Sequence, residues 1–258
     1  MIYVGTAGWT LYRAADAFPV AGTILERYAA VLPAVEVNSS FYRSHSPTTY
    51  AKWAACTPRR FRFAVKLPQE ITHEERLRRS RRPLESFLAE TRGLGRRLGP
   101  LLVQLPPSLE FESRIARRFF GMLRQMHDGP VVCEPRHQSW FTERAEAVLV
   151  EHRVGRVAAD PATVPAAARP GGWPGVAYWR LHGSPRKYWS VYDTERLRRW
   201  AAAALALPRR TDAWCVFDNT AGGGAVRNAL EFAALVGGPR GRHVAAVHDR
   251  PRRRPRAA

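Results

Sequence analysis

Long hydrophobic runs and cysteines are both scarce in this sequence. No apolar stretch approaches the roughly 18 residues that a membrane-spanning helix requires, and the first residues, MIYVGTAGWT, lack the basic and apolar segments of a signal peptide. The three cysteines, Cys56, Cys133 and Cys215, form no CxxC pair, which argues against a disulfide framework or a zinc knuckle. We therefore expect a cytoplasmic protein with no membrane partner.

Lysine is also rare, although the chain is strongly basic. The formal net charge is +19, and of the 41 Lys and Arg residues only Lys52, Lys66 and Lys187 are lysines. Either the arginines bind a polyanion such as nucleic acid, or they are solvated residues of a composition rich in Ala, Gly, Pro and Arg. Both interpretations stay open on the sequence alone.

Short apolar and β-branched runs alternate along the chain with segments of helical periodicity. The runs span 2–5, 34–38, 61–66, 100–105, 131–134, 156–160, 176–182 and 213–219. The helical segments span 23–32, 47–56, 83–95, 113–126, 142–152, 193–207 and 225–238. This alternation predicts parallel βαβ units in an α/β fold, and eight strands in about 220 residues predict a single-domain (β/α)8 TIM-type barrel. An open doubly wound sheet is less suitable, because no GxGxxG follows the first strand.

Two segments depart from the regular alternation. Residues 161–175, PATVPAAARPGGWPG, are too rich in proline and glycine for a helix, so a loop should replace the sixth helix. Before the next helix, Asp193 is suited to be its N-cap. We expect residues 1–238 to form the barrel and residues 239–258 to form a basic, disordered C-terminal tail.

Nearly every predicted strand ends on a polar or charged residue. In a (β/α)8 barrel these ends meet at one mouth, where reactive residues gather. Side-chain alternation places Glu36 with Asn38, and Arg180 with His182, on the same side of their strands. Several charges converging on one mouth favour a bound ligand, although any single pair could be purely structural. The predicted mouth residues are Glu36, Asn38, Lys66, Glu134, Arg136, His137, Arg180, His182, Asp218 and Asn219.

Two loops add candidate contacts. The segment HGSPRKYWSVYD, residues 182–193, combines cations with aromatic side chains such as Tyr188, which suits a loop that holds a phosphate or a sugar. The segment NSSFYRSHSP, residues 38–47, contributes Tyr42 more weakly. No HExxH or similar spacing occurs, so no metal site is predicted, and the sequence predicts neither a cofactor nor an oligomeric state.

Several of these stretches carry a family resemblance. GTAGW, VEVNSSFYRSHSP, FRFAVKLPQEITH, LGPLLVQLPPS, SWF, YWRLHG, FDN and NALEF occur in that order between residues 5 and 232. Together they resemble the DUF72 family, also called YecE-like. The resemblance implies a TIM-barrel fold and leaves the activity open, because no biochemical function is established for the family.

The chain departs from the family pattern near the strand ends. Family members commonly carry FEFRHPSW where this chain has VCEPRHQSW, so Pro135 replaces an aromatic residue and Gln138 a proline. Members often have FNN where this chain has FDN, so Asp218 adds an acidic charge at the mouth. The resemblance retains the acid, arginine and histidine of this segment as Glu134, Arg136 and His137.

The leading functional hypothesis is an enzyme, a hydrolase or an isomerase, that binds a small anionic or sugar-like, polyhydroxylated substrate at the mouth. Glu134 and His182 would transfer protons, while Lys66, with Arg136 and Arg180, would stabilise negative charge. One alternative is a nucleic-acid-binding or endonuclease-like barrel, for which fold analogy is a weak warrant. The other is a non-enzymatic protein that only binds a small molecule.

Overall fold

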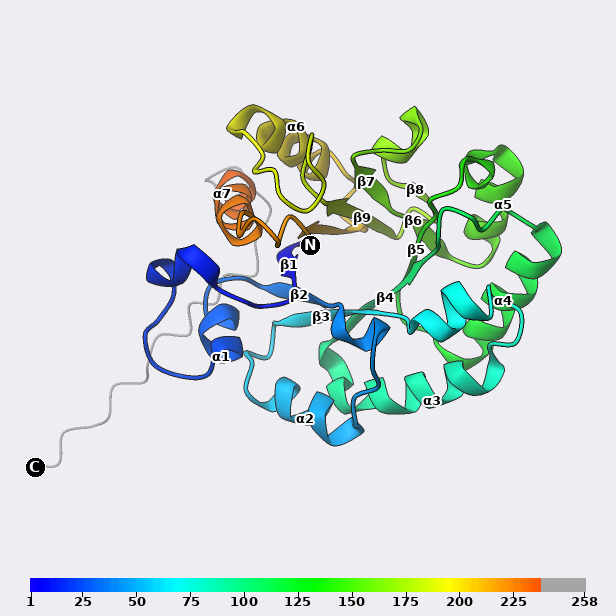
Figure 1. Cartoon of the computed structure of the whole chain (residues 1–258), viewed down its shortest axis with the longest axis horizontal. Helices are drawn as coiled ribbons and strands as arrows, with labels where there is room; N and C mark the ends of the chain where they lie inside the picture. The colour runs from blue at the N-terminus through cyan, green and yellow to red at the C-terminus, as the bar shows by residue number, and fades with distance from the viewer. Residues whose placement is uncertain (238–258) are drawn as a thin grey trace, which may run out of the picture.

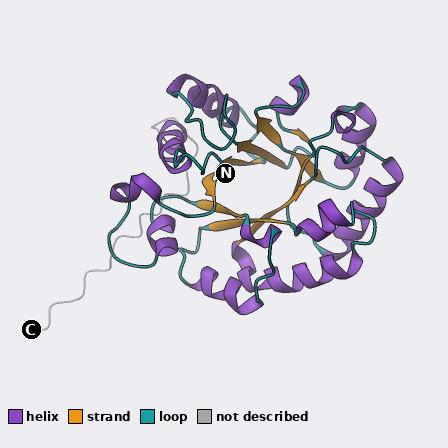
Figure 2. Ribbon diagram, in the orientation of Figure 1, coloured by secondary structure: helices purple, strands orange, loops and turns teal. Residues whose placement is uncertain are grey.

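The protein is a barrel of parallel strands surrounded by helices, as a computed structural model shows for residues 1–237 (Figures 1 and 2). The strands are β1 Ile2–Ala7, β2 Ala34–Val37, β3 Arg62–Lys66, β4 Leu98–Gln104, β5 Val131–Glu134, β6 Val154–Arg156, β7 Ala158–Asp160, β8 Gly171–Gly172, β9 Val176–Leu181 and β10 Asp212–Phe217. The α-helices are α1 Ile24–Ala29, α2 Pro47–Ala55, α3 Arg81–Thr91, α4 Ser113–Met126, α5 Glu143–Glu151, α6 Thr194–Leu205 and α7 Ala225–Gly237.

The sheet order is β7-β9-β10-β1-β2-β3-β4-β5-β6-β8. β6 pairs with β5, and β7, which follows it after Val157, pairs with β9. The two short strands are therefore the two halves of the sixth strand of the barrel. Because one half pairs with β5 and the other with β9, this strand closes the barrel. With this strand counted once and the two-residue β8 set aside, the predicted eight-stranded TIM-type barrel is confirmed.

The sixth helix is absent, as the sequence predicts. Between β7 and β9 the described chain forms only the four-residue 3-10 helix Pro165–Ala168 and β8, which pairs antiparallel with β6. Asp193 is the N-cap of α6 and accepts a hydrogen bond from the backbone N–H of Arg196, 2.8 Å away. The predicted tail, 239–258, and the boundary before it lie outside the described residues.

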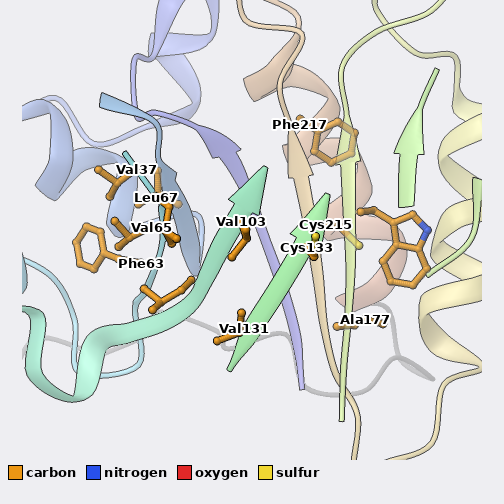
Figure 3. Close-up of a cluster of buried hydrophobic side chains, with 14 of the residues drawn as sticks. Val37, Phe63, Val65, Leu67, Val103, Val131, Cys133, Ala177, Cys215 and Phe217 are labelled. Atoms are coloured by element: carbon orange, nitrogen blue, oxygen red, sulfur yellow. The ribbon is translucent and has the colours of Figure 1, made fainter. Parts of the chain in front are cut away.

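Two hydrophobic clusters follow from the alternation of side chains along each strand. Outward-facing residues such as Val65, Val103 and Cys133 pack under the helices, and Figure 3 shows part of this cluster. Inward-facing residues fill the barrel itself, where Trp214 stacks against Tyr3 and Tyr178 with ring centroids 4.7 and 5.9 Å away. The interior of the barrel is thus a packed core and not a channel.

The inward-facing residues of the strands are apolar in the middle of the barrel and polar at its C-terminal end. Ala34, Ala64, Leu102, Val132, Tyr178 and Val216 belong to the inner cluster. Two residues later on the same strands come Glu36, Lys66, Gln104, Glu134, Arg180 and Asp218, which are all buried. Because alternate residues of a strand share a face, this polar layer lies on top of the apolar core, at the C-terminal mouth.

Candidate functional site

Arg180 on β9 is the centre of the polar layer. Its Nε and Nη2 atoms donate to the two carboxylate oxygens of Glu36 at 3.0 and 2.7 Å. Its Nη1 donates to Glu134 at 2.7 Å, and Nη2 also reaches Asp218 at 3.1 Å. Three carboxylates from β2, β5 and the end of β10 therefore surround one guanidinium, a geometry that its planar set of N–H donors suits.

These ion pairs determine the charge states of the buried acids. Burial alone would raise the pKa of Glu134, but Arg180, Arg136 and His182 hold it well below its usual range. Burial opposes ionisation of Asp218 as well, and Arg180 and His182 lower the pKa of that carboxyl. Both acids are thus anions at neutral pH, and removing Arg180 would leave buried charges unpaired.

Glu36 and Arg180 lie at the bottom of the polar layer and are as buried as Glu134 and His182. Glu36 is 0% exposed and Arg180 1% exposed. Glu36 also accepts a hydrogen bond from the hydroxyl of Tyr178 at 2.8 Å. With its nitrogen atoms bonded to carboxylates, Arg180 holds the layer together. A substrate-binding role for either residue stays a prediction.

His182 connects two of the three acids. Its Nδ1 lies 2.9 Å from Asp218 Oδ2, and its Nε2 lies 3.1 Å from Glu134 Oε1. A ring with a proton on each nitrogen donates to both carboxylates, whereas a neutral ring donates to only one. A histidine fixed by carboxylates in this way is oriented for proton transfer.

The accessible part of the mouth is lined by cations. Arg136 donates to Glu134 at 2.9 Å and lies 3.4 Å from Nε2 of His182. Lys187 is half-buried and has no ion pair within the described chain, and burial and Arg136 lower its pKa. A cavity of about 30 Å³ lies between Glu134, Arg136, His182 and Lys187. It has room for one or two water molecules.

Lys66 reaches the mouth but forms no ion pair there. No carboxylate among residues 1–237 lies within ion-pair distance of its Nζ, and the nearby acids pair with Arg136 and Arg180 instead. The Nζ of Lys66 lies 3.7 Å above the ring of Phe41, a cation–π contact. Burial, followed by repulsion from Arg180, lowers the pKa of Lys66 to about 8. Lys66 is consequently a cation that gives up its proton readily.

The segment 182–193 covers His182, and Tyr188 makes the ring contact. The Tyr188 ring stands edge-on to His182 with centroids 5.7 Å apart, and Lys187 lies over the Tyr188 ring. The turn requires glycine at Gly183, which has φ +93°, because a Cβ there would lie 2.8 Å from the carbonyl oxygen of Ser190. The backbone N–H of Gly183 donates to the hydroxyl of Tyr192 at 2.7 Å.

The remaining predicted residues do not join this cluster. Tyr42 is 74% exposed and packs on Phe41. His137 caps the 3-10 helix Gln138–Phe141 by accepting from the N–H of Ser139. The amide of Asn219 donates to Ser190 and to Asn228, and it thereby helps to hold the segment 182–193, the cover over His182, in place. Asn38 lies at the end of β2, and its buried Oδ1 has no hydrogen-bond partner among the described residues.

Two members of the site were not predicted as site residues. Tyr178 lies two positions before Arg180 on β9, so the alternation that places Arg180 inside also places Tyr178 there. Lys187 lies in the loop 182–193, for which the sequence predicts a ligand contact without indicating which cation faces inward. Among residues 1–237 no group of three His, Cys, Asp or Glu side chains is arranged to hold a metal ion. None of the described helices could span a membrane.

Fold and site together define a TIM-barrel protein with a charged, histidine-containing mouth. The chain matches the family described as "Protein of unknown function DUF72" over residues 3–254, and it belongs to that family. The resemblance seen in the sequence is thereby confirmed.

Most of the similar proteins described next cover nearly the whole chain, and one covers less than half of it. The UPF0759 protein YunF of Bacillus subtilis is 25% identical over 92% of this chain and 95% of its own length. The UPF0759 protein YecE of Escherichia coli is 32% identical over 41% of this chain and 38% of its own. A crystal structure of a DUF72 family protein from Thermotoga maritima has a TM-score of 0.74 at 26% identity, covering 91% of this chain and 98% of that one. Another, from Enterococcus faecalis, has a TM-score of 0.77 at 21% identity, covering 91% and 95%.

Proposed function

We propose that this protein is an enzyme, a hydrolase or an isomerase, that binds a small anionic substrate at the barrel mouth and transfers a proton through His182. The observation that carries the proposal is the buried chain Asp218–His182–Glu134, which ends beside a cavity lined by Arg136 and Lys187. An oriented imidazole next to cations is what proton transfer on an anionic substrate requires.

The charges of the mouth support an anion. The acids are Glu36, Glu134 and Asp218, and the cations are Arg136, Arg180, Lys66 and Lys187, so the cations exceed the acids by one before His182 is counted. A phosphate or carboxylate would offset this excess. Asp160 is not counted, because it lies on the same face of β7 as Ala158, which points away from the barrel interior and packs under the helices.

In this proposal the roles of the three hydrogen-bonded residues Asp218, His182 and Glu134 differ from those that the sequence suggests. Glu134 stays ionised through Arg180 and Arg136, so it orients His182 and does not serve as a general acid. Asp218 orients the opposite ring nitrogen. Lys66 is suited to stabilise developing negative charge, since its proton is held only loosely. A substrate larger than water would need the segments carrying Pro161 and Lys187 to separate, as loops do in many enzymes.

Turnover in D2O tests the proposal. Sugar phosphates and phosphate monoesters are incubated with the protein and followed by NMR: an isomerase introduces deuterium beside the carbonyl, and a hydrolase releases inorganic phosphate. We expect one of these reactions, with kcat lowered about 10²–10⁴-fold in His182→Gln. His127→Gln, at the opposite end of the barrel, should retain activity.

Two results count against the proposal. Unchanged turnover in His182→Gln would remove the histidine from the mechanism. Binding of phosphate at the mouth without turnover of either substrate class would favour the non-enzymatic binding protein.

A further inference from the structure

A large groove lies on the outside of the barrel, between the start of α3 and the neighbouring helix α4, which lie side by side (Figure 1). Its volume is about 830 Å³, far larger than that of the mouth cavity. Glu70 is the one acid that lines it. The arginines that line it are Arg78, Arg79, Arg81, Arg82, Arg117 and Arg118.

Half of these arginines lack a counter-charge. Arg78 pairs with Glu112 at 2.5 Å, Arg81 with Glu85 at 3.3 Å, and Arg117 with Glu151. The other three, Arg79, Arg82 and Arg118, are exposed, and their side chains have neither an ion pair nor a hydrogen bond within residues 1–237. Solvated arginines scattered by composition alone would not collect in one concave surface with so few acids.

A second, independent feature of the groove also favours an anion. Ser80, 1% exposed, is the N-cap of α3, yet its side chain makes no capping hydrogen bond. Ser80 is among the residues that line the groove, and its buried Oγ has no hydrogen-bond partner in the described part of the chain. The first intrahelical bond runs from the N–H of Leu84 to Ser80, so the amides of Arg81 and Arg82 lie ahead of it at the positive end of the helix.

We propose that this groove binds the phosphate backbone of a single-stranded nucleic acid. Several arginines in a row suit successive phosphates, and the partly exposed Met122 gives the groove an apolar part against which a base can lie. A groove between two helices admits one extended strand, whereas a duplex would touch only its rims. A lipid surface fits less well, since none of the large exposed apolar side chains of the described chain lines the groove.

Fluorescence anisotropy with labelled oligo-uridine of about 16 nucleotides tests this. The full-length chain is titrated between about 50 and 200 mM salt. The groove variant is Arg79→Gln/Arg82→Gln/Arg118→Gln, which breaks no ion pair seen in the structure. The matched control is Arg198→Gln/Arg209→Gln/Arg210→Gln, which removes the same charge from exposed positions on and after α6. Thermal melts monitored by circular dichroism establish that both variants fold.

We expect the groove variant to raise the Kd at least about tenfold, and to reduce the slope of log K against log salt by about 2, as three lost contacts at roughly 0.7 each imply. The control should change the Kd less than about threefold. The proposal is overturned by equal losses in both variants, by wild-type affinity in the groove variant, or by no binding at about 50 mM salt. A wild-type slope near −0.7 would also overturn it, because it indicates a single phosphate.

Discussion

Arg180 lies in the barrel interior, and its environment shows how a single charged residue is accommodated there. A lone guanidinium at this depth would be very costly, and so would any one of its three acidic neighbours. Together they satisfy one another's hydrogen bonds, with Arg180 within 3.1 Å of Glu36, Glu134 and Asp218. Clusters of this kind seldom add stability over an apolar core. Their position at the mouth therefore favours a functional reason for their presence.

The lowered pKa of Lys66 predicts how the stability of the protein depends on pH. Its pKa falls from the usual 10.5 to about 8 in the folded protein, so between these values the unfolded chain binds more protons than the native one. Stability should therefore rise with pH through this window. The difference in unfolding free energy between wild type and Lys66→Met should increase by about 2–3 kcal/mol from pH 7.5 to pH 10.

Urea unfolding at the two pH values measures this difference, with the exposed Lys52→Met as the control. A pH-independent difference for Lys66→Met would show that burial does not lower the pKa of Lys66. An equal rise for Lys52→Met would assign the effect to the general charge of the chain.

The polar ends of the predicted strands explain which site residues could be found from the sequence. They include Glu36, Lys66, Glu134, Arg180 and Asp218, which are all buried in the polar layer at the mouth. Alternation gives the side of a strand but not the partner across the barrel. For that reason the pairing of Arg180 with Glu36, 144 residues away, and the contact of Lys66 with Phe41 could not be derived.

Among the elements, the segment 182–193 lies against His182, and Asn228 on α7 holds this segment in place. Asn228 accepts from the N–H of Tyr192 and from Asn219, both at 3.0 Å, and donates to the carbonyl of Tyr192 at 3.0 Å. It is 0% exposed, so water cannot replace these bonds. The cover is thus anchored to a helix of the barrel wall.

Asn228→Ala should release this cover. We expect a loss of about 2–4 kcal/mol in unfolding free energy, because buried polar groups of the partners lose their hydrogen bonds. Hydrogen exchange followed by mass spectrometry should show faster exchange in residues 183–192 than in α4. Gln125→Ala, on the exposed face of α4, should stay within about 0.5 kcal/mol of wild type. Unchanged protection of 183–192 in Asn228→Ala would refute the anchoring role.

Periodicity located the elements, while their ends depended on contacts distant in sequence. The third helix was predicted over 83–95, but α3 spans Arg81–Thr91 and a 3-10 turn follows. The chain leaves the helical path at Gly95, which has φ +52°. Glycine is also needed at Gly93, which lies against α2, because a Cβ there would be 2.1 Å from the carbonyl oxygen of Pro47. The sixth strand was predicted at 156–160 alone, because its first half, β6, is recognisable only by its pairing with β5.

For the whole molecule, the net charge of +19 is unevenly distributed. The mouth is nearly balanced, because its acids offset most of its cations. Residues 238–258 hold seven arginines and one aspartate and so contribute +6, while three arginines without an ion pair line the groove beside α3. The sequence shows the total charge but not this groove, since it depends on which helices become neighbours around the barrel.

The central claim is that His182 belongs to an anion-binding, proton-transferring mouth. Its most direct test is 15N NMR of histidine-labelled protein during titration with inorganic phosphate. The chain has eight histidines, and the resonances lost in His182→Gln identify the ring in question. We predict that both ring nitrogens of His182 shift and saturate with a Kd of about 1 mM or lower. Lys187→Met should weaken this response about tenfold, whereas the groove variant should leave it unchanged. His182 resonances that stay constant up to about 10 mM phosphate, or that respond equally in Lys187→Met, would contradict the claim.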